Sequence, residues 1–253
     1  GSFVGKLTLH IANGKVAKDD YELMEIAADH YKPDENIESL INNNEEPFKN
    51  EIFEVVGYST VPLYRYFVIE NTIDTMVLDA LKWRMPEIDV VLSNGFRFCP
   101  PNTTPDHTGN IPVTQGYIFD MLPVDSTVRT AKVSGAQILD WLEKELNNVF
   151  SKNASERFGG WVIKFLGMKV KFYAFGEKGK RVQEVAIGGN PLDTSKIYSI
   201  CACERDGDPD DMLCRIRGVK EAKNTKYTLH KVMREYLQKN SPVTPIPHGS
   251  AIA

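Results

Sequence analysis

A six-residue segment, Ser93-Asn94-Gly95-Phe96-Arg97-Phe98, carries the residues best suited to bind a ligand. It follows the β-branched run Ile88–Leu92, which is typical of a buried strand. Gly95 can adopt a positive φ or let a ligand approach the backbone. Arg97 offers donors in a planar fork that fits an oxyanion such as phosphate or sulfonate. The alternative is a plain strand-to-loop turn with a surface arginine, and the local sequence leaves both open.

A second candidate is the acidic loop Glu204–Asp211, which follows the expected strand 197–203. Its carboxylates suit hard cations, but its glycine is misplaced for an EF-hand loop, and a solvated turn is the alternative. Together with Asn94 and Arg97, this loop would suit an anionic ligand, and Arg205 and Asp211 are its candidate binding residues. The aromatic residues that could contact an apolar part of the ligand are Phe96, Phe98 and Phe158.

Other kinds of catalytic site find little support in the sequence. The five histidines are widely spaced, and neither an H-E-x-x-H motif nor a G-x-S-x-G motif occurs. Cys201 and Cys203 form a Cys-x-Cys pair without a second close pair, which is a poor zinc signature. We therefore predict that Cys99, Cys201, Cys203 and Cys214 are buried free thiols.

Composition narrows the class of protein. The chain has 253 residues, 42 % hydrophobic and 25 % charged, as expected of a globular protein with a sizeable core. The net charge of −4 and the absence of clustered basic residues argue against a nucleic-acid polymer as partner. No apolar run approaches the ~20 residues that a membrane-spanning helix needs.

The pattern of apolar residues predicts a mixed α/β, or α+β, protein with mixed sheets. Asn13-Gly14 predicts a hairpin turn, Thr72 a helix cap, and Ser134-Gly135-Ala136-Gln137 a capping box. The last segment contains three prolines and should be extended or disordered. The expected strands are two within 3–24, then 51–61, 88–92, 124–133, 168–174, 181–187 and 197–203; the expected helices are 35–41, followed by a polar linker 42–47, then 72–83, 116–122, 134–150 and one that Thr228 caps.

From about Val55 to Tyr236, the chain resembles the C-terminal domain of the 5′-nucleotidase family. Six motifs follow in the family's order, and together they are far more specific than any one alone. Within the family, Gly95-Phe96-Arg97, and Asn148–Phe150 followed by Gly159-Gly160, resemble the thiosulfohydrolase branch. The six motifs are Val56-Gly57 with Pro62-Leu63, Glu70–Ala80, Asp89–Arg97, Gly109–Pro123, Val133–Leu139 and Arg181–Tyr198.

The resemblance implies a layered α/β/β/α fold and a division of the chain. Residues 1–32 would end a preceding metallophosphoesterase domain, 33–50 would be an interdomain helix and linker, and 51–240 would be the substrate-binding domain. Residues 241–253 would form an extended tail. Gly1-Ser2 is typical of a pair left by tag removal, so we expect the natural chain to be longer.

The resemblance also implies a mechanism shared between two domains. Two divalent metal ions in the N-terminal domain would hydrolyse a small anionic substrate, while this chain would hold no cofactor and would be inactive alone. The parent would be periplasmic, secreted or on the cell surface. The substrate-binding residues would be Asn94, Gly95, Arg97, Arg205 and Asp211.

Two departures from the family pattern bear on the substrate. The family has an aromatic residue just after its Leu-Pro pair, where this chain has Val124, and the family's second stacking aromatic is absent from Cys203–Asp208. A nucleotide or a related phospho or sulfo ester is the expected substrate. The alternatives are a cover or docking module that has lost nucleoside binding, and a ligand-binding protein without an enzymatic partner.

Overall fold

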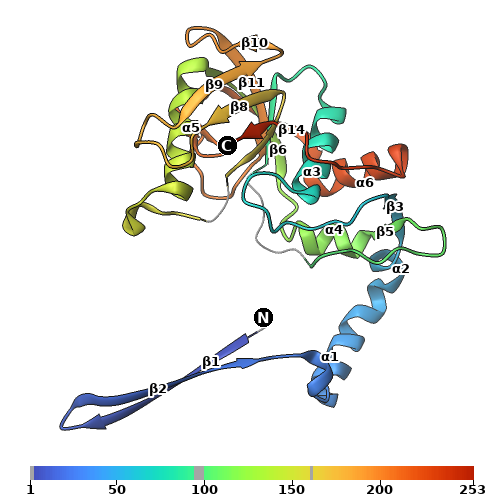
Figure 1. Cartoon of the computed structure of the whole chain (residues 1–253). Helices are drawn as coiled ribbons and strands as arrows, with labels where there is room; N and C mark the ends of the chain where they lie inside the picture. The colour runs from blue at the N-terminus through green and yellow to red at the C-terminus, as the bar shows by residue number, and fades with distance from the viewer. Residues whose placement is uncertain (1–2, 94–99, 160–161) are drawn as a thin grey trace. The chain divides into compact units, whose positions relative to one another are not determined.

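The structure is a computed structural model that describes residues 3–93, 100–159 and 162–253. The chain divides into two compact units, Gly1–Asn50 and Glu51–Ala253, which Figure 1 shows and which we describe one at a time. The predicted ligand-binding residues Asn94, Gly95 and Arg97 lie outside the described residues. The domain boundaries implied by the resemblance stay predictions.

The first unit begins with the predicted hairpin, which is confirmed. Strand β1 (Phe3–Ala12) pairs antiparallel with β2 (Lys15–Glu25). The turn residues Asn13 and Gly14 have φ of 52° and 71°, as a two-residue turn with the twist of its strands requires. A 3₁₀ turn η1 (Ala28–His30) follows.

Helix α1 (Glu35–Glu45) is longer than predicted. It begins at Asp34, whose carboxylate accepts hydrogen bonds from the amides of Asn36 and Ile37. The segment expected as a polar linker is helical: α1 runs into η2 (Glu46–Phe48) and then α2 (Lys49–Ile52). Proline is tolerated in the first turn of a helix, and Pro47 occupies such a position in η2, so it does not force an extended linker.

The second unit contains two larger mixed sheets. The first has the strand order β14-β6-β11-β4-β7, in which only β11 and β4 are parallel neighbours. The second has the order β10-β9-β8-β15, in which only β8 and β15 are parallel. The predicted mixed α/β fold with mixed sheets is confirmed. The strands are β4 (Val90–Ser93), β6 (Thr127–Ser134), β7 (Lys164–Leu166), β8 (Met168–Phe172), β9 (Val182–Ile187), β10 (Asn190–Pro191), β11 (Ile197–Cys203), β14 (Lys220–Thr228) and β15 (Ala251–Ile252).

Two short antiparallel pairs complete the strands of this unit. One joins β3 (Val55–Ser59) to β5 (Ile111–Thr114), and the other joins β12 (Met212–Leu213) to β13 (Ile216–Arg217). The segment expected as a strand from residue 51 is therefore shorter, because α2 extends to Ile52. Strands β5, β7, β10, β12, β13, β14 and β15 were not predicted.

The helices lie close to their predicted ranges. The capping box at Ser134 and Gln137 is present at the start of α5. The cap of α3 is Asn71 rather than Thr72, because the Asn71 side chain accepts from the amide of Asp74 while the Thr72 hydroxyl donates to the carbonyl of Pro62. The helices of this unit are α3 (Thr72–Arg84), α4 (Gln115–Met121), α5 (Gly135–Phe150), η3 (Ala154–Glu156) and α6 (Leu229–Asn240).

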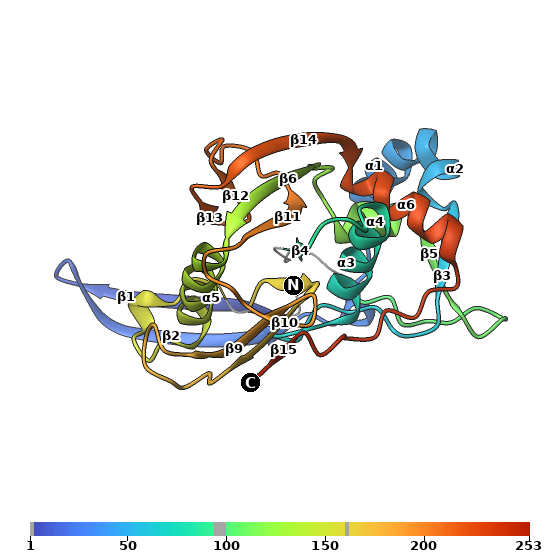
Figure 2. The same cartoon turned by 90° about the horizontal axis from the view of Figure 1, so that it is seen from above.

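The five-stranded sheet separates two hydrophobic cores. Along β4, Val91 points into the core formed with α3, α4 and α6, whereas Val90 and Leu92 point into the other core. The second core also contains Trp141 of α5 and Val170 of the four-stranded sheet. Figure 2 shows α3, α4 and α6 gathered on one side of the unit and α5 on the other, with the four-stranded sheet facing the larger one.

The last segment of the chain is extended and packs against this unit. The amide of Val243 donates to the carbonyl of Tyr58, and β15 adds a parallel strand beside β8, with Ala251 opposite Val170. Val243 and Ser250 are buried. The sequence of this segment does not predict these contacts, because they are made with strands that are distant in the chain.

Candidate functional site

Strand β4, which leads into the segment that contains Arg97, ends beside a cluster of buried charged side chains. Asp74, in the first turn of α3, accepts hydrogen bonds from Asn71 (2.7 Å) and from the Ser93 hydroxyl (3.1 Å) and lies 3.3 Å from the guanidinium of Arg65. The Arg65 and Asp74 side chains are 6 % and 2 % exposed. This network fixes the end of β4.

Lys164 is a second buried charge near this end of the sheet. Its ammonium donates to the carbonyls of Val68 and Val162, the latter at 2.7 Å. Burial lowers the pKa of Lys164 to about 8, although Asp74 and Glu70 act in the opposite direction. Neither the composition nor the local pattern of β7 indicates a buried lysine.

The other two predicted binding residues lie on different surfaces. Arg205 is exposed and lines a pocket with Val124, Ser126 and Cys203. Asp211 lines a more open hollow beside Arg129, and its backbone carbonyl accepts from the amide of Val219. Their roles in ligand binding stay predictions.

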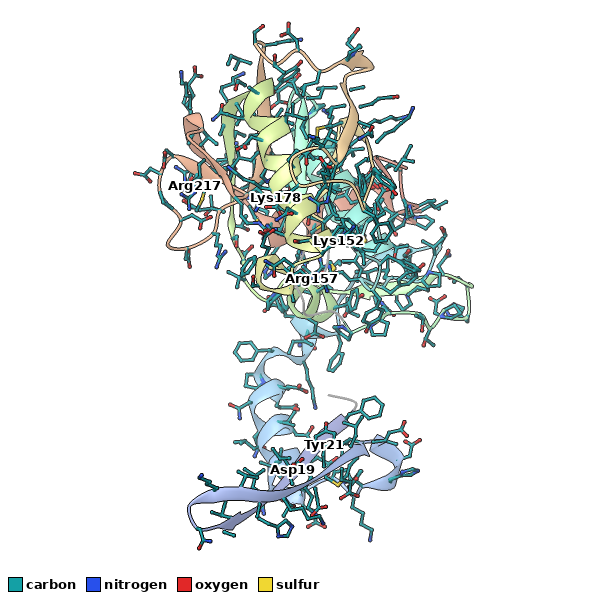
Figure 3. The ribbon with its side chains drawn as sticks, turned by 60° about the vertical axis from the view of Figure 1, so that its left-hand side comes forward. Asp19, Tyr21, Lys152, Arg157, Lys178 and Arg217 are labelled. Atoms are coloured by element: carbon teal, nitrogen blue, oxygen red, sulfur yellow. The ribbon has the colours of Figure 1, made fainter. Side chains whose placement is uncertain are left out.

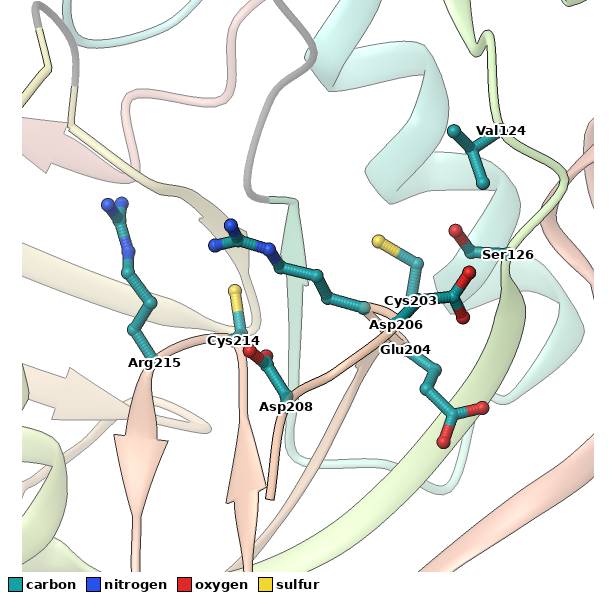
Figure 4. A pocket seen from close by; sticks show the side chains of 9 residues that line it. Val124, Ser126, Cys203, Glu204, Asp206, Asp208, Cys214 and Arg215 are labelled. Carbon is teal, nitrogen blue, oxygen red and sulfur yellow. The ribbon is translucent and has the colours of Figure 1, made fainter. Parts of the chain in front are cut away.

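The pocket has a volume of about 280 Å³ and joins two segments that are far apart in sequence. The residues just before β6 meet the loop after β11, because the two strands are antiparallel neighbours with Val128 opposite Cys203. Figure 4 shows Val124 and Ser126 on one side of this pocket and Arg215 on the other. The residues that line it are Val124, Ser126, Cys203, Glu204, Arg205, Asp206, Asp208, Cys214 and Arg215.

The acidic loop that forms one wall is tied to the sheet by Arg129. The Arg129 guanidinium lies 3.6 Å from the Glu204 carboxylate and donates to the carbonyl of Asp210 at 3.1 Å. Asn224 of β14 donates to the same carboxylate at 2.9 Å. The charge of Glu204 is thus balanced by Arg129, and its carboxylate is hydrogen-bonded by Asn224. Asp206 and Asp208 are the other two carboxylates of this wall that line the pocket.

The two thiols of the pocket are neutral at ordinary pH. Burial raises the pKa of Cys203 to about 11 and raises that of Cys214 well above its usual value. Both are free cysteines, as is Cys201. The prediction of buried thiols is confirmed for Cys201 and Cys214, but Cys203 is only partly buried because it lines the pocket, and Cys99 lies outside the described residues. A protonated thiol is a weak nucleophile and a poor metal ligand, so these side chains act as small apolar walls.

The far wall is the two-residue turn between β12 and β13. Cys214 and Arg215 have φ of 50° and 68°, a left-handed conformation that costs a non-glycine residue roughly 1–2 kcal/mol. The Arg215 guanidinium lies 2.7 Å from the carboxylate of Glu145, whose side chain is 4 % exposed. Burial raises the pKa of Glu145, and Arg215 opposes that rise. The sequence analysis missed Arg215, since no glycine or asparagine marks this turn.

The described residues offer neither a metal-binding cluster nor a membrane-spanning helix. Within residues 3–93, 100–159 and 162–253, no group of three or more His, Cys, Asp or Glu side chains is arranged to hold a metal ion. No helix in the described part of the chain is both long and apolar enough to cross a membrane.

Comparison with known proteins gives one family. Residues 55–204 match the family model described as 5′-nucleotidase, C-terminal domain. A search of curated proteins found no match.

Several solved structures have the same fold. The chain matches the sulfate thiohydrolase SoxB of Thermus thermophilus with a TM-score of 0.79 and 22 % identity, covering 100 % of this chain and 44 % of that one. A 5′-nucleotidase precursor, also from Thermus thermophilus, matches with a TM-score of 0.77 and 18 % identity, covering 100 % of this chain and 50 % of that one. The NAD nucleotidase NadN of Haemophilus influenzae matches with a TM-score of 0.61 and 13 % identity, covering 99 % of this chain and 53 % of that one. The chain therefore spans about half the length of these proteins.

Proposed function

This chain belongs to the 5′-nucleotidase C-terminal domain family, and from that premise we propose that it is the substrate-binding half of a metal-dependent hydrolase of phospho or sulfo esters. The parents of this family are metallophosphoesterases. The described residues do not fit a dinuclear metal centre, so we assign this chain no step of the metal chemistry. Its part is to bind the ester and to orient it.

The observation that carries the proposal is the pocket formed by the segment before β6, the loop after β11 and the turn between β12 and β13. The family resemblance implies that two segments contact the substrate, the one after Leu122-Pro123 and the one after Cys203. Val124 and Ser126 from the first segment, and Glu204 to Asp206 from the second, line the same pocket. Ligand sites are typically concave, with apolar walls and a few convergent polar groups, and this pocket has that character.

The chemistry of the walls favours a small, hydroxylated ester over a nucleotide. Arg205 can donate to the oxygens of a phosphate or sulfate group, and Asp206 and Asp208 can accept from hydroxyl groups. Among the described residues that line the pocket, none has an aromatic ring, so a base would lose stacking of about 1–3 kcal/mol. The volume of about 280 Å³ lies at the small end for ligand sites.

The exposed apolar face of the hairpin β1–β2 indicates that another protein domain covers it. One of its faces presents seven large apolar side chains that are all exposed in this chain, whereas the opposite face carries ion pairs such as Lys6 with Glu22. A two-stranded hairpin is marginal alone and needs an apolar surface to cover it. The matched proteins are about twice as long as this chain, so we propose the N-terminal catalytic half of the parent as that cover. Following the family resemblance alone, we also propose that the parent is exported from the cytoplasm. The seven are Phe3, Leu7, Leu9, Ile11, Val16, Tyr21 and Leu23.

Calorimetric titration of this chain tests the proposal, because the pocket lies wholly within the second unit. Glycerol 3-phosphate should bind at least as tightly as AMP, and adenosine should not bind. Arg205→Ala should weaken glycerol 3-phosphate binding about 10-fold or more, the usual loss for a hydrogen bond to a charged group. Arg217→Ala is the matched control, since Arg217 is exposed and does not line the pocket (Figure 3).

The competing function is a cover or docking module without ligand binding. The absence of stacking aromatics among the described residues of the pocket is the observation that favours it. In that case neither the esters nor AMP would bind, and none of them would raise the melting temperature of the chain. That result would contradict the substrate-binding proposal.

A further inference from the structure

The turn between β12 and β13 uses residues that its backbone disfavours. A two-residue hairpin turn with positive φ at both positions is normally Asn-Gly or a similar pair. Here Cys214 and Arg215 occupy both positions. Strained backbone of this kind persists only where its surroundings hold it, and it clusters at ligand-binding sites.

Helix α5 holds this turn from one face. Gln137, Trp141 and Glu145 are spaced four residues apart, so their side chains lie in one row along the helix. The Gln137 amide donates to the carbonyls of Arg217 and Gly218 at 2.9 Å each, and the Trp141 indole donates to the carbonyl of Cys214 at 3.1 Å.

Glu145 completes this row through a side chain rather than through the backbone. Its carboxylate pairs with the guanidinium of Arg215 at 2.7 Å. The hydrogen bonds from Gln137 and Trp141 would hold any residues in the turn, since they are accepted by backbone carbonyl groups. The ion pair with Glu145, by contrast, depends on the identity of Arg215.

The side chains of the turn explain why these residues are used. Figure 4 shows Cys214 and Arg215 extending from the ends of the two strands toward the same side, and both line the pocket. The Nε atom of Arg215 is buried and has no hydrogen-bond partner among the described residues. Nε of Arg84 and of Arg129 is buried in the same way, so this atom does not by itself indicate a ligand. The Arg215 side chain as a whole is 24 % exposed and lines the pocket, so it keeps accessible surface after it pairs with Glu145.

We propose that Arg215 binds the tetrahedral anionic group of the ester, with its guanidinium held in place by Glu145. The group is a phosphate or a sulfate, and the two share the negatively charged oxygens that a planar guanidinium recognises. Glu145 occupies one nitrogen of the fork and thereby fixes its orientation. Arg205 provides the second cation of the pocket from the opposite loop. This inference rests on the proposed function.

The test measures the dissociation constants of inorganic phosphate and inorganic sulfate by titration of the whole chain. Arg215→Lys keeps the charge that Glu145 needs but loses the planar fork, and it should weaken binding of the preferred anion about 10-fold. Arg217→Lys, the same substitution two residues away on the same hairpin, should change it less than 2-fold. The anion with the smaller dissociation constant, phosphate or sulfate, is the group that the pocket recognises.

A second variant guards against loss of folding. Glu145→Gln combined with Arg215→Gln removes both charges, so that no buried carboxylate is left without a partner, and circular dichroism checks that the fold is kept. This variant should bind neither anion measurably.

The possible failures are distinguishable. If Arg205→Ala abolishes anion binding while both Arg215 variants bind as the unaltered chain does, the role of Arg215 is wrong and the proposed function stands. If the unaltered chain binds neither the anions nor the esters, both are wrong.

Discussion

The two units of the chain place opposite kinds of side chain in unusual environments. The first unit exposes large apolar residues: Leu7, Leu9 and Ile11 of β1 are 58 %, 49 % and 61 % exposed. The second unit instead buries charged residues, among them Asp74 and Lys164.

The difference shows which unit can be stable by itself. Each of these two buried charges of the second unit has partners within that unit: Asp74 has Arg65, Asn71 and Ser93, and Lys164 has two backbone carbonyls. Buried charges are tolerated only with such partners. The apolar face of the hairpin has no comparable cover among the described residues of the first unit, so the predictions below compare the two units in the free energy of unfolding.

The largest effect is expected for one substitution made in both units. Asp74→Ala should lower the free energy of unfolding by about 3–5 kcal/mol, because it leaves Arg65 buried without its carboxylate. Asp20→Ala, in the hairpin, removes contacts with His10 and Lys18 that are exposed to solvent, and it should change the free energy of unfolding far less than Asp74→Ala does. Urea denaturation monitored by circular dichroism measures both. Similar losses in the two variants would contradict the comparison.

The next effect concerns the pH dependence of stability. The pKa of Lys164 is lowered from 10.5 to about 8 in the folded protein, so between these values the unfolded chain binds more protons at this group. Stability should therefore rise with pH from about 8 to 10.5, by roughly 3 kcal/mol in all, and the gain is lost as the pH falls through 8.

Lys164→Met should remove this rise. The measurement is the free energy of unfolding at about pH 7 and about pH 10, compared between the variant and the unaltered chain, because other groups titrate equally in both. Lys169→Met, at an exposed position of β8, should behave like the unaltered chain. A variant at Lys164 that keeps the full rise would mean that this lysine is solvated in the folded protein.

The smallest effect is expected on the apolar face of the hairpin. Leu9→Ala should change the free energy of unfolding of this chain by less than about 0.5 kcal/mol, because Leu9 is 49 % exposed. Leu142→Ala, at a position 1 % exposed in α5, is the matched control and should cost about 2–5 kcal/mol. Differential scanning calorimetry would register both. A large loss from Leu9→Ala would show that the first unit already covers this face.

Local sequence predicted most elements of the fold because their signals act over a few residues. The Asn13-Gly14 turn, the capping box at Ser134 and the apolar stripe of α5 all follow from backbone and side-chain chemistry within one or two turns. The same reasoning misplaced the cap of α3. Thr72 and Asn71 are both good caps, and the choice depends on the carbonyl of Pro62, which accepts from Thr72.

By itself, then, the sequence determined the α/β class, the hairpin and the helices, and its motifs determined the family. The tertiary structure alone decided that the segments around Val124 and Cys203 share a pocket, that Arg215 forms its far wall, and that Lys164 is buried. The physical reason is the range of the interactions. Periodicity and capping are local, whereas a pocket forms from strand pairing and from contacts such as that of Glu145 with Arg215, which lie far apart in the chain.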